Sequence, residues 1–435
     1  MPSRRNEVGR LKLLRSADYP DIQSLFHALD WSCQPAALDT SAVIPILEAV
    51  RSEGDEALYR FTQQFDGCDL RASGLALSDA EMGEGLKAAR PGLAEALRAL
   101  HKNLTAFHKK QVVESWFIET EEGVRVGQIV KPVARVGVYV PGGKAAYPST
   151  VLMAVVPAKV AGVEEIAACV PPDPTGKLNP NTILALHEMK VKEIYKVGGA
   201  QAIAAMAYGT QSIPRVDKIV GPGNPYVVAA KKELYGAVGI DLLAGPSELV
   251  VMADDPAEAD VVVADLLSQL EHGQGTRSLL VTVSQPLADA VASVVEAKVR
   301  EARGAGAQEQ KVEIVVVQNH VEAVALVNLL APEHLEMLME DFSALLSKVR
   351  NAGAIFLGME TSVVLGDYAA GTNHVLPTGT TSRFSSPLGV RDFQKSSNVV
   401  FSNHKANRKI APVVQELSEA EGLPAHNESL EKRMG

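Results

Sequence analysis

The hydrophobic pattern of roughly the first 110 residues is that of helices. Apolar side chains recur at helical spacing from Thr40 to Phe65, and a second pattern of this kind runs from Ser78 to Gln111 with a break at Pro91. We therefore predict a mainly helical N-terminal region over residues 1–115, and we expect it to pack on the second of the two domains described next.

From residue 116 the pattern changes to that of strands. Alternating positions flank Glu121-Glu122-Gly123, which predicts a β-hairpin connector over residues 116–135. Short apolar strands then alternate with helices, a pattern typical of parallel β-α units with helices on both faces of a sheet. The strands form two series, the first at 136–140, 165–170, 193–197 and 218–220, and the second at 249–252, 278–283, 312–317 and 354–357.

This pattern predicts an α/β fold with two doubly wound, incomplete Rossmann-like parallel-sheet domains, at residues 136–245 and 246–380. A small helical C-terminal arm over residues 381–435 follows them. We expect a cleft between the two domains, with ligands at the carboxyl ends of the strands, as is usual for open parallel sheets.

Composition and charge narrow the functions that this fold can serve. The 435 residues are 46% hydrophobic and 22% charged, which is ordinary for a globular protein and excludes the disordered and fibrous classes. The formal net charge of -10, without a run of Lys and Arg interleaved with aromatic residues, argues against a nucleic-acid partner. No apolar run approaches the roughly 18 residues of a membrane span, and no secretory signal is evident, so we expect no membrane association.

The three cysteines, Cys33, Cys68 and Cys169, are widely spaced and form no CxxC pattern. This spacing argues against a disulfide framework and fits a reducing cytoplasm, where we expect the protein to work. Cys169 lies within an apolar run and is predicted to be a buried strand residue rather than a nucleophile.

Three glycine-rich turns each follow a predicted strand of the first series and open a helix. They are Val140-Pro141-Gly142-Gly143, Val197-Gly198-Gly199-Ala200-Gln201 and Val220-Gly221-Pro222-Gly223-Asn224. Their backbone N–H groups can approach a pyrophosphate closely. None matches GxGxxG, and each taken singly can be only a tight turn in a parallel sheet. Three in one domain, with two amide side chains and Tyr139 nearby, favour a ligand of nucleotide size.

A carboxylate and an imidazole stand side by side in Ala331-Pro332-Glu333-His334-Leu335-Glu336. Because Pro332 favours the first turn of a helix, we expect Glu333 and His334 near a helix N-terminus, a suitable place to handle protons. The alternative is a capped surface helix with a solvated Glu-His pair.

Three further segments carry side chains that can bind a metal. Gln269 and His272 are three apart at the end of a helix that starts near Pro256, so they share a face, although a His in a last turn often only complements the helix dipole. Asp367 and His374 lie in a segment predicted to be irregular, and Glu421 to His426 follow an amphipathic helix near the C-terminus. Gln269, His272, Asp367 and His426 form a mixed nitrogen and oxygen set that suits zinc, but spacing alone does not select these four.

The ordered motifs resemble those of the histidinol dehydrogenase family over nearly the whole chain. Besides the three glycine turns, the motifs that carry the resemblance are Ala244-Gly245-Pro246-Ser247-Glu248, Gln269 to Gly273, Pro332-Glu333-His334, Gly371-Thr372-Asn373-His374 and Glu421 to His426. It implies a zinc enzyme of histidine biosynthesis that oxidises L-histidinol to L-histidinaldehyde and then to L-histidine, using two NAD in one site. It also implies an intertwined homodimer.

The resemblance further implies a role for each matching residue. Zinc ligands are Gln269, His272 and Asp367, with His426 reaching in from the other subunit; substrate contacts are Ser247, Gln269, His272, His334, Asp367, His374, Glu421 and His426; and NAD contacts are Tyr139, Gln201 and Asn224. Neutral His334 is a suitable base for the alcohol step, and Glu333 for the water that hydrates the aldehyde. Zinc would mainly position the substrate.

Three alternatives stay open at this point. A relative with the same fold can act on another polar alcohol, such as a sulfonated diol. A zinc hydrolase uses similar water activation but has no use for three nucleotide-type turns. A non-catalytic metal- or ligand-binding protein does not account for Glu333 and His334.

Overall fold

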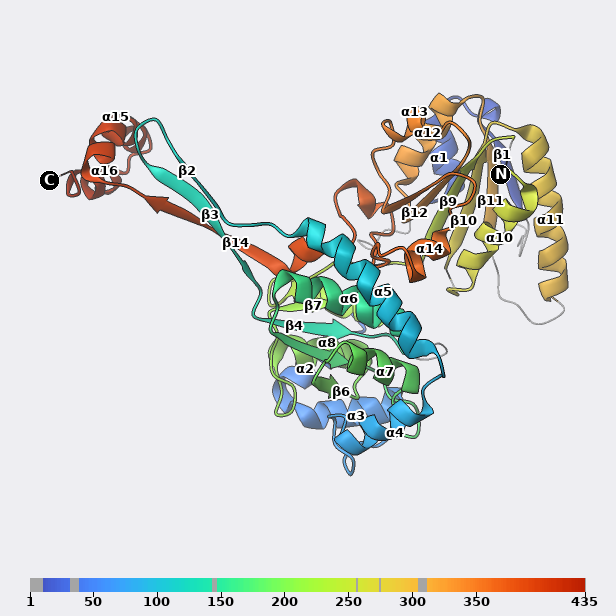
Figure 1. Cartoon of the computed structure of the whole chain (residues 1–435), viewed down its shortest axis with the longest axis horizontal. Helices are drawn as coiled ribbons and strands as arrows, with labels where there is room; N and C mark the ends of the chain where they lie inside the picture. Colours follow the sequence, from blue (N-terminus) through green and yellow to red (C-terminus); the bar gives the residue numbers. More distant parts are fainter. Residues whose placement is uncertain are drawn as a thin grey trace.

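The computed structural model describes residues 11–31, 39–142, 147–255, 257–273, 275–303 and 311–434. Two sheet-containing bodies lie next to each other, and a narrow arm projects away from them (Figure 1). The arm ends in helices α15 (His404–Ala420) and α16 (Pro424–Glu431). The predicted α/β class with two parallel sheets is confirmed.

The first body is built on a five-stranded sheet in the order β6-β5-β4-β7-β8, and every pairing in it is parallel. Alternate residues of its strands enter different core clusters, so both faces are covered, and Cys169 is a buried strand residue as predicted. Its strands are β4 (Arg135–Tyr139), β5 (Glu165–Cys169), β6 (Glu193–Tyr195), β7 (Lys218–Val220) and β8 (Gly239–Ile240).

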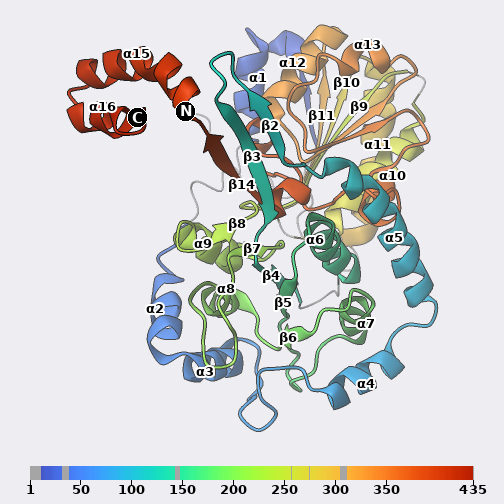
Figure 2. The same cartoon turned by 60° about the vertical axis from the view of Figure 1, so that its left-hand side comes forward.

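Helices cover both faces of this sheet (Figure 2). One face carries α5 (Leu93–His108), α6 (Pro148–Ala161) and α7 (Pro180–Glu188), and the other carries α2 (Ile44–Glu53), α3 (Asp55–Phe65), α8 (Gly199–Tyr208) and α9 (Pro225–Leu234). Helix α4 (Asp79–Ala88) packs against α7, and its N-terminus is fixed by a capping box between Ser78 and Glu81.

The second body holds a six-stranded parallel sheet in the order β1-β11-β10-β9-β12-β13. The sequence predicted β9, β10, β11 and β13 but missed β1 at one edge and β12 in the interior. The strands are β1 (Lys12–Arg15), β9 (Glu248–Ala253), β10 (Arg277–Thr282), β11 (Lys311–Val316), β12 (His334–Leu338) and β13 (Ala354–Leu357); the helices are α1 (Ile22–Leu29), α10 (Ala259–Leu270), α11 (Gln285–Arg303), α12 (His320–Leu330), α13 (Ser343–Leu346) and α14 (Val363–Tyr368).

The N-terminal helices divide between the two bodies, which corrects the expectation that they pack on the second. Only β1 and α1 join the second body, where Leu25, Leu29 and Trp31 enter its core. Helices α2 to α5 pack on the first sheet, because their apolar stripes meet α8, α7 and α6. From residue 11 on, the described chain therefore contributes β1 and α1 to the second body, then α2 to α9 to the first body, and then the remaining strands of the second sheet.

The arm is a three-stranded antiparallel ribbon in the order β14-β3-β2. The predicted hairpin is present as β2 (Trp116–Glu119) and β3 (Arg125–Pro132), and β14 (Gln394–Phe401) runs along β3. Trp116, Phe117 and Ile118 of β2 are 46%, 52% and 58% exposed, so the ribbon carries uncovered apolar side chains on both of its faces. Among the helices that the structure describes, none combines the length and apolar character needed to cross a bilayer.

Candidate active site

Glu333 and His334 do not open a helix; His334 is the first residue of strand β12 and Glu333 directly precedes it, which corrects the expectation from Pro332. Pro332 links the end of α12 to that strand, and His334 pairs with Leu249 of β9 and Ala354 of β13. The central position of β12 overrides the helix-start preference of the proline, because the strand's side chains are all buried in the sheet. Glu333 and His334 are only 6% and 3% exposed, which also excludes the solvated surface pair.

The backbone of Glu248 holds both members of the pair. Its N–H donates to Glu333 Oε2 at 2.9 Å, and its carbonyl oxygen lies 3.2 Å from His334 Nδ1. Because a carbonyl only accepts, the imidazole donates from Nδ1, and Nε2 is left as the free base nitrogen. Nε2 is buried without a hydrogen-bond partner, 3.8 Å from Asp367 Oδ1.

Burial and mutual charge shift the pKa of each group in this cluster. Burial raises the pKa of Glu333 to about 7. Burial, and then the negative charge of Glu333, raise the pKa of Glu248 to about 8. Burial alone lowers the pKa of His334, but the Glu333 and Asp367 carboxylates more than offset this and raise it to about 9. The Glu333 and Glu248 carboxyls therefore exchange protons near neutral pH, as acid-base catalysis requires, whereas the His334 ring loses its proton and becomes a base as the pH rises toward about 9.

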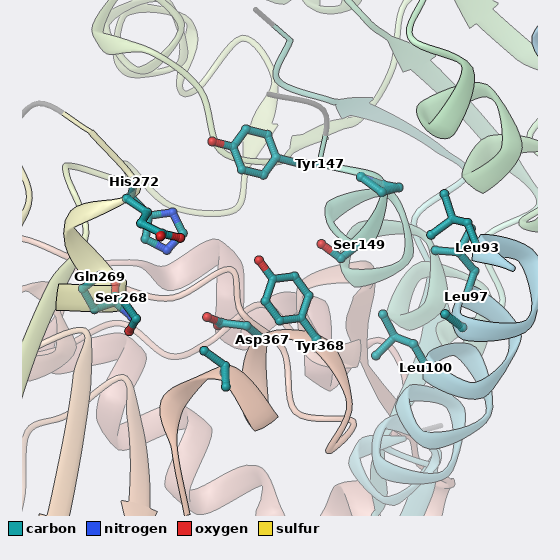
Figure 3. A pocket seen from close by; sticks show the side chains of 14 residues that line it. Leu93, Leu97, Leu100, Tyr147, Ser149, Ser268, Gln269, His272, Asp367 and Tyr368 are labelled. Carbon is teal, nitrogen blue, oxygen red and sulfur yellow. The ribbon is translucent and has the colours of Figure 1, made fainter. Parts of the chain in front are cut away.

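A cavity of about 510 Å³ opens beside this pair. Three of the predicted metal ligands line it, and Figure 3 shows Gln269, His272 and Asp367 around a common space. Gln269 lies in the last turn of α10, which runs from Ala259 to Leu270, whereas His272 lies in the turn just after it and not on the helix as predicted; Pro256 lies outside the described residues. The other lining residues are Leu93, Ala96, Leu97, Leu100, Tyr147, Pro148, Ser149, Ser268, Glu271, Val364 and Tyr368.

The donor set fits a zinc ion. The Gln269 side chain is 1% exposed, and its Oε1 has no hydrogen-bond partner, so a buried oxygen is left for a ligand. Burial lowers the pKa of His272, which favours the neutral, metal-binding imidazole. Within the described part of one chain, no three His, Cys, Asp or Glu side chains form a metal-binding group by themselves.

The remaining predicted substrate contacts fall in two places. Asp367 lies on the short helix α14 rather than in an irregular segment, and His374 follows it in a loop, with Nδ1 3.1 Å from the Asp367 carbonyl and Nε2 3.1 Å from Thr150 Oγ1. Ser247 directly precedes β9. Glu421 and His426 lie on the arm, far from the cavity of the same chain (Figure 1).

The predicted nucleotide contacts lie at the carboxyl edge of the first sheet. Tyr139 ends β4, is 3% exposed, and accepts a hydrogen bond at Oη from Gly199 N at 3.1 Å. Gln201, in the first turn of α8, is 1% exposed, and neither of its side-chain polar atoms has a partner. Asn224 caps α9 through Oδ1, which leaves its side-chain NH₂ for a ligand. Two glycine turns open helices as predicted, whereas Gly143 of the first turn lies outside the described residues.

The two sheets contribute opposite edges to the site. The glycine turns follow the carboxyl ends of the first sheet's strands, as expected. Glu248 and His334, however, begin their strands, and α10 ends beside the start of β10, so the second sheet presents its amino edge. The expectation that both sheets use their carboxyl ends is therefore wrong for the second.

Glu248 had no predicted role, although it belongs to the motif Ala244-Gly245-Pro246-Ser247-Glu248. A usable signal was present: Glu248 is an acidic residue at the start of an otherwise wholly apolar strand, and it is 2% exposed. A charged side chain is rarely buried without a specific purpose.

Comparison with known proteins decides the family. The family model described as histidinol dehydrogenase matches residues 34–434. The chain belongs to the histidinol dehydrogenase family. It is 48% identical over 392 residues to the histidinol dehydrogenase of Moorella thermoacetica, covering 89% of this chain and 92% of the relative. It is 45% identical over 430 residues to that of Rhodospirillum rubrum, covering 98% and 99%.

A solved structure agrees with this membership of the histidinol dehydrogenase family. The crystal structure of histidinol dehydrogenase from Elizabethkingia anophelis superposes with a TM-score of 0.91 at 34% identity, covering 98% of each chain. The similarity extends over both bodies and the arm, so the fold as a whole is that of the family.

Proposed function

We propose that the protein is an NAD-dependent, zinc-requiring dehydrogenase that oxidises L-histidinol to L-histidine through L-histidinaldehyde. The observation that carries the proposal is the buried Glu333–His334 pair, whose His334 Nε2 lies 3.8 Å from Oδ1 of Asp367, a residue that lines the cavity together with Gln269 and His272. Family membership favours this substrate over another polar alcohol such as a sulfonated diol. The free cysteines Cys68 and Cys169 accord with work in the cytoplasm.

His334 is the proposed base of the alcohol step. Its Nδ1 donates to the Glu248 carbonyl, which orients Nε2 toward the space beside Asp367. An alcohol O–H within reach of Nε2 can transfer its proton there as hydride leaves the carbon. The buried position excludes water that would otherwise compete for this proton.

Glu333 is the proposed base of the second oxidation. The hydrogen of the aldehyde carbon can leave as hydride only after a water has added to give the hydrate, and a carboxylate can take a proton from that water. The N–H of Glu248 fixes Glu333 Oε2, so the side chain has one defined position. Two consecutive residues at the start of β12 would thereby serve the two oxidations.

Gln269, His272 and Asp367 would hold a zinc ion, with His426 of the partner subunit as a further ligand. Tyr139, Gln201 and Asn224 would contact NAD. Zinc, when bound, would mainly position the substrate, and the nicotinamide would accept hydride. The proposed substrate contacts are Ser247, Gln269, His272, His334, Asp367, His374, Glu421 and His426.

A homodimer with shared sites is part of the proposal. His426 and Glu421 lie on an arm that points away from the cavity of their own chain, and the arm's ribbon exposes Trp116, Phe117 and Ile118. Exposed apolar surfaces of this kind are typical of intersubunit contacts. A second copy that contacts the arm would cover them and receive His426.

The direct test mixes purified protein, zinc, L-histidinol and NAD and follows nicotinamide absorbance. The proposal predicts two NADH for each histidine formed, and turnover of a sulfonated diol should be absent. No NADH from histidinol in the presence of zinc would refute it, and a product formed without NAD would indicate a hydrolase.

A further inference from the structure

A buried ion pair that the proposed chemistry does not use contacts the third glycine turn, Val220 to Asn224. Lys231 of α9 and Asp241, just after β8, have side chains that are only 2% and 1% exposed, and they form a salt bridge. Two charges withdrawn from water to this extent are costly unless they have precise partners. Their further partners therefore indicate what the pair does.

Both partners are backbone atoms of Gly221, the first glycine of the turn. Lys231 Nζ donates to the Gly221 carbonyl oxygen at 3.0 Å, and Gly221 N donates to Asp241 Oδ2 at 2.7 Å. The two side chains thus bind the two polar groups of one residue from two different elements. Lys231 can reach the turn because helix side chains tilt toward the N-terminus, where α9 begins.

Gly221 is also the point where the turn contacts the proposed nucleotide residues. Its φ is +114°, a conformation that L side chains rarely adopt, and a Cβ there would collide with the carbonyl oxygen of Tyr139. Three residues later, Asn224 caps α9 with its Oδ1. A shift of Gly221 would therefore move the backbone of Tyr139 and Asn224 relative to each other.

Asp241 also ties the turn to the chain that enters the second body. Its N donates to the Ile219 carbonyl at 3.2 Å, so it continues the parallel pairing of β8 with β7. Ser247 and Glu248 follow a few residues later, at the amino edge of the second sheet. The Lys231–Asp241 pair thus lies where the chain passes from the carboxyl edge of the first sheet, with its proposed NAD contacts, to the amino edge of the second sheet, with its proposed substrate contacts.

We propose that Lys231 and Asp241 are positioning residues that fix the Gly221–Asn224 turn in the conformation that binds the dinucleotide. This inference rests on the proposed use of NAD at that turn. Neither side chain touches a reacting atom, so their loss should weaken NAD binding and leave the chemical steps nearly unchanged.

The decisive variants remove the pair without leaving an unpaired charge. K231M/D241A deletes both hydrogen bonds to Gly221, whereas K231M/D241N restores an acceptor for the Gly221 N–H. We expect the KM for NAD to rise roughly tenfold or more in K231M/D241A and by a smaller factor in K231M/D241N, with kcat and the histidinol KM within about threefold of wild type.

A matched control separates positioning from general stability. Arg135 and Glu193 form a partly buried pair at the amino ends of strands of the same sheet, away from the glycine turns, with side chains 12% and 35% exposed. R135M/E193Q should lower the melting temperature and leave the KM for NAD unchanged. Isothermal titration of each folded variant with NAD alone gives an independent measure of binding.

The outcomes distinguish this inference from the proposed function. Wild-type protein that neither binds nor reduces NAD would refute the proposed function itself. If the wild type uses NAD and both variants have the wild-type KM for NAD, or lose kcat while that KM stays constant, the positioning role is wrong. If K231M/D241A does not fold, the isosteric K231M/D241N alone carries the test, and an unchanged KM in it refutes the inference.

Discussion

Replacing Glu333 by Gln tests whether the two proposed catalytic residues, Glu333 and His334, divide the two oxidations. Gln has the same shape, and its side-chain oxygen can accept the Glu248 N–H that now lies 2.9 Å from Glu333 Oε2. The fold should therefore lose no more than about 1 kcal/mol of stability. What the variant lacks is a group that can take a proton from water.

The size of the effect follows from that loss. A positioned general base contributes about 10²- to 10⁴-fold, or roughly 3 to 5 kcal/mol of transition-state stabilisation. We expect the oxidation of histidinaldehyde to slow by that factor, and the oxidation of histidinol to NADH and aldehyde by only a few-fold. Supplying each substrate separately with NAD, and measuring NADH under single-turnover conditions, separates the two rates.

The pH profiles provide a second readout. Burial raises the pKa of Glu333 to about 7, and only the deprotonated carboxylate is a base. The aldehyde step in the wild type should thus increase with pH through about 7 and then level off, and this rise should be missing from E333Q. Removal of the Glu333 charge also removes one cause of the raised pKa of His334, so the alcohol step should reach its plateau at lower pH.

Equal slowing of both steps in E333Q would refute the division of labour. The control is E313Q, which changes another buried glutamate of the same sheet, 6% exposed and paired with Arg277. It should lower stability and leave the ratio of the two rates unchanged. A changed ratio in E313Q would mean that the assay reports general damage to the sheet.

Three other predictions concern the shared site, the metal and the fold. Chains carrying H426A and chains carrying H272A should each be inactive, but dimers mixed by co-refolding should regain about a quarter of wild-type activity, since half of the dimers have one intact site; no recovery would contradict sharing. Dialysis against a chelator should abolish NADH formation and lower the melting temperature, and added zinc should restore both; full activity without zinc would refute the metal set. K196M should lower the free energy of unfolding by about 1–3 kcal/mol in urea titrations at neutral pH, because buried Lys196 Nζ lies 2.6 Å from Glu81 Oε1. Burial raises the pKa of Glu81, but its bonds to Lys196 and Ser78 lower it below the usual 4.5, so the stabilisation is present above 4.5 and the wild-type advantage should shrink as the pH falls through the lowered pKa; an advantage that grows in acid would contradict the pairing.

Local patterns were sufficient for most of the fold. Eight strands and the hairpin were predicted because buried parallel strands are continuous apolar runs bounded by glycine or proline. Strand β12 was missed because Pro332 precedes it and its sequence includes His334 and Glu336. Only its neighbours β9 and β13, distant in sequence, make those polar residues part of a strand.

The candidate site was predicted as a set of residues but not as an arrangement. Spacing predicted that Gln269 and His272 share a helix face; the structure puts both at the cavity, but His272 reaches it from the turn after α10. The end of the sheet that Gln269 and His272 meet depends on the topology of the fold. One part of it was predictable, because a residue at the end of a helix that leads into a parallel strand must lie near that strand's amino end. Glu248 contacts Glu333 and His334 through its backbone N–H and carbonyl oxygen. The chemistry of its side chain therefore could not predict these contacts.

The use of opposite sheet edges gives the two halves of the cleft opposite electrostatic polarity. At the carboxyl edge of the first sheet, α8 and α9 present their N-termini, where exposed N–H groups attract the negative phosphates of a dinucleotide. At the amino edge of the second sheet, α10 presents its C-terminus, whose carbonyl groups favour a cation. The backbone alone thus favours an anion on one side and a metal on the other. A fold with both sheets facing the same way would present two anion sites and no natural place for zinc.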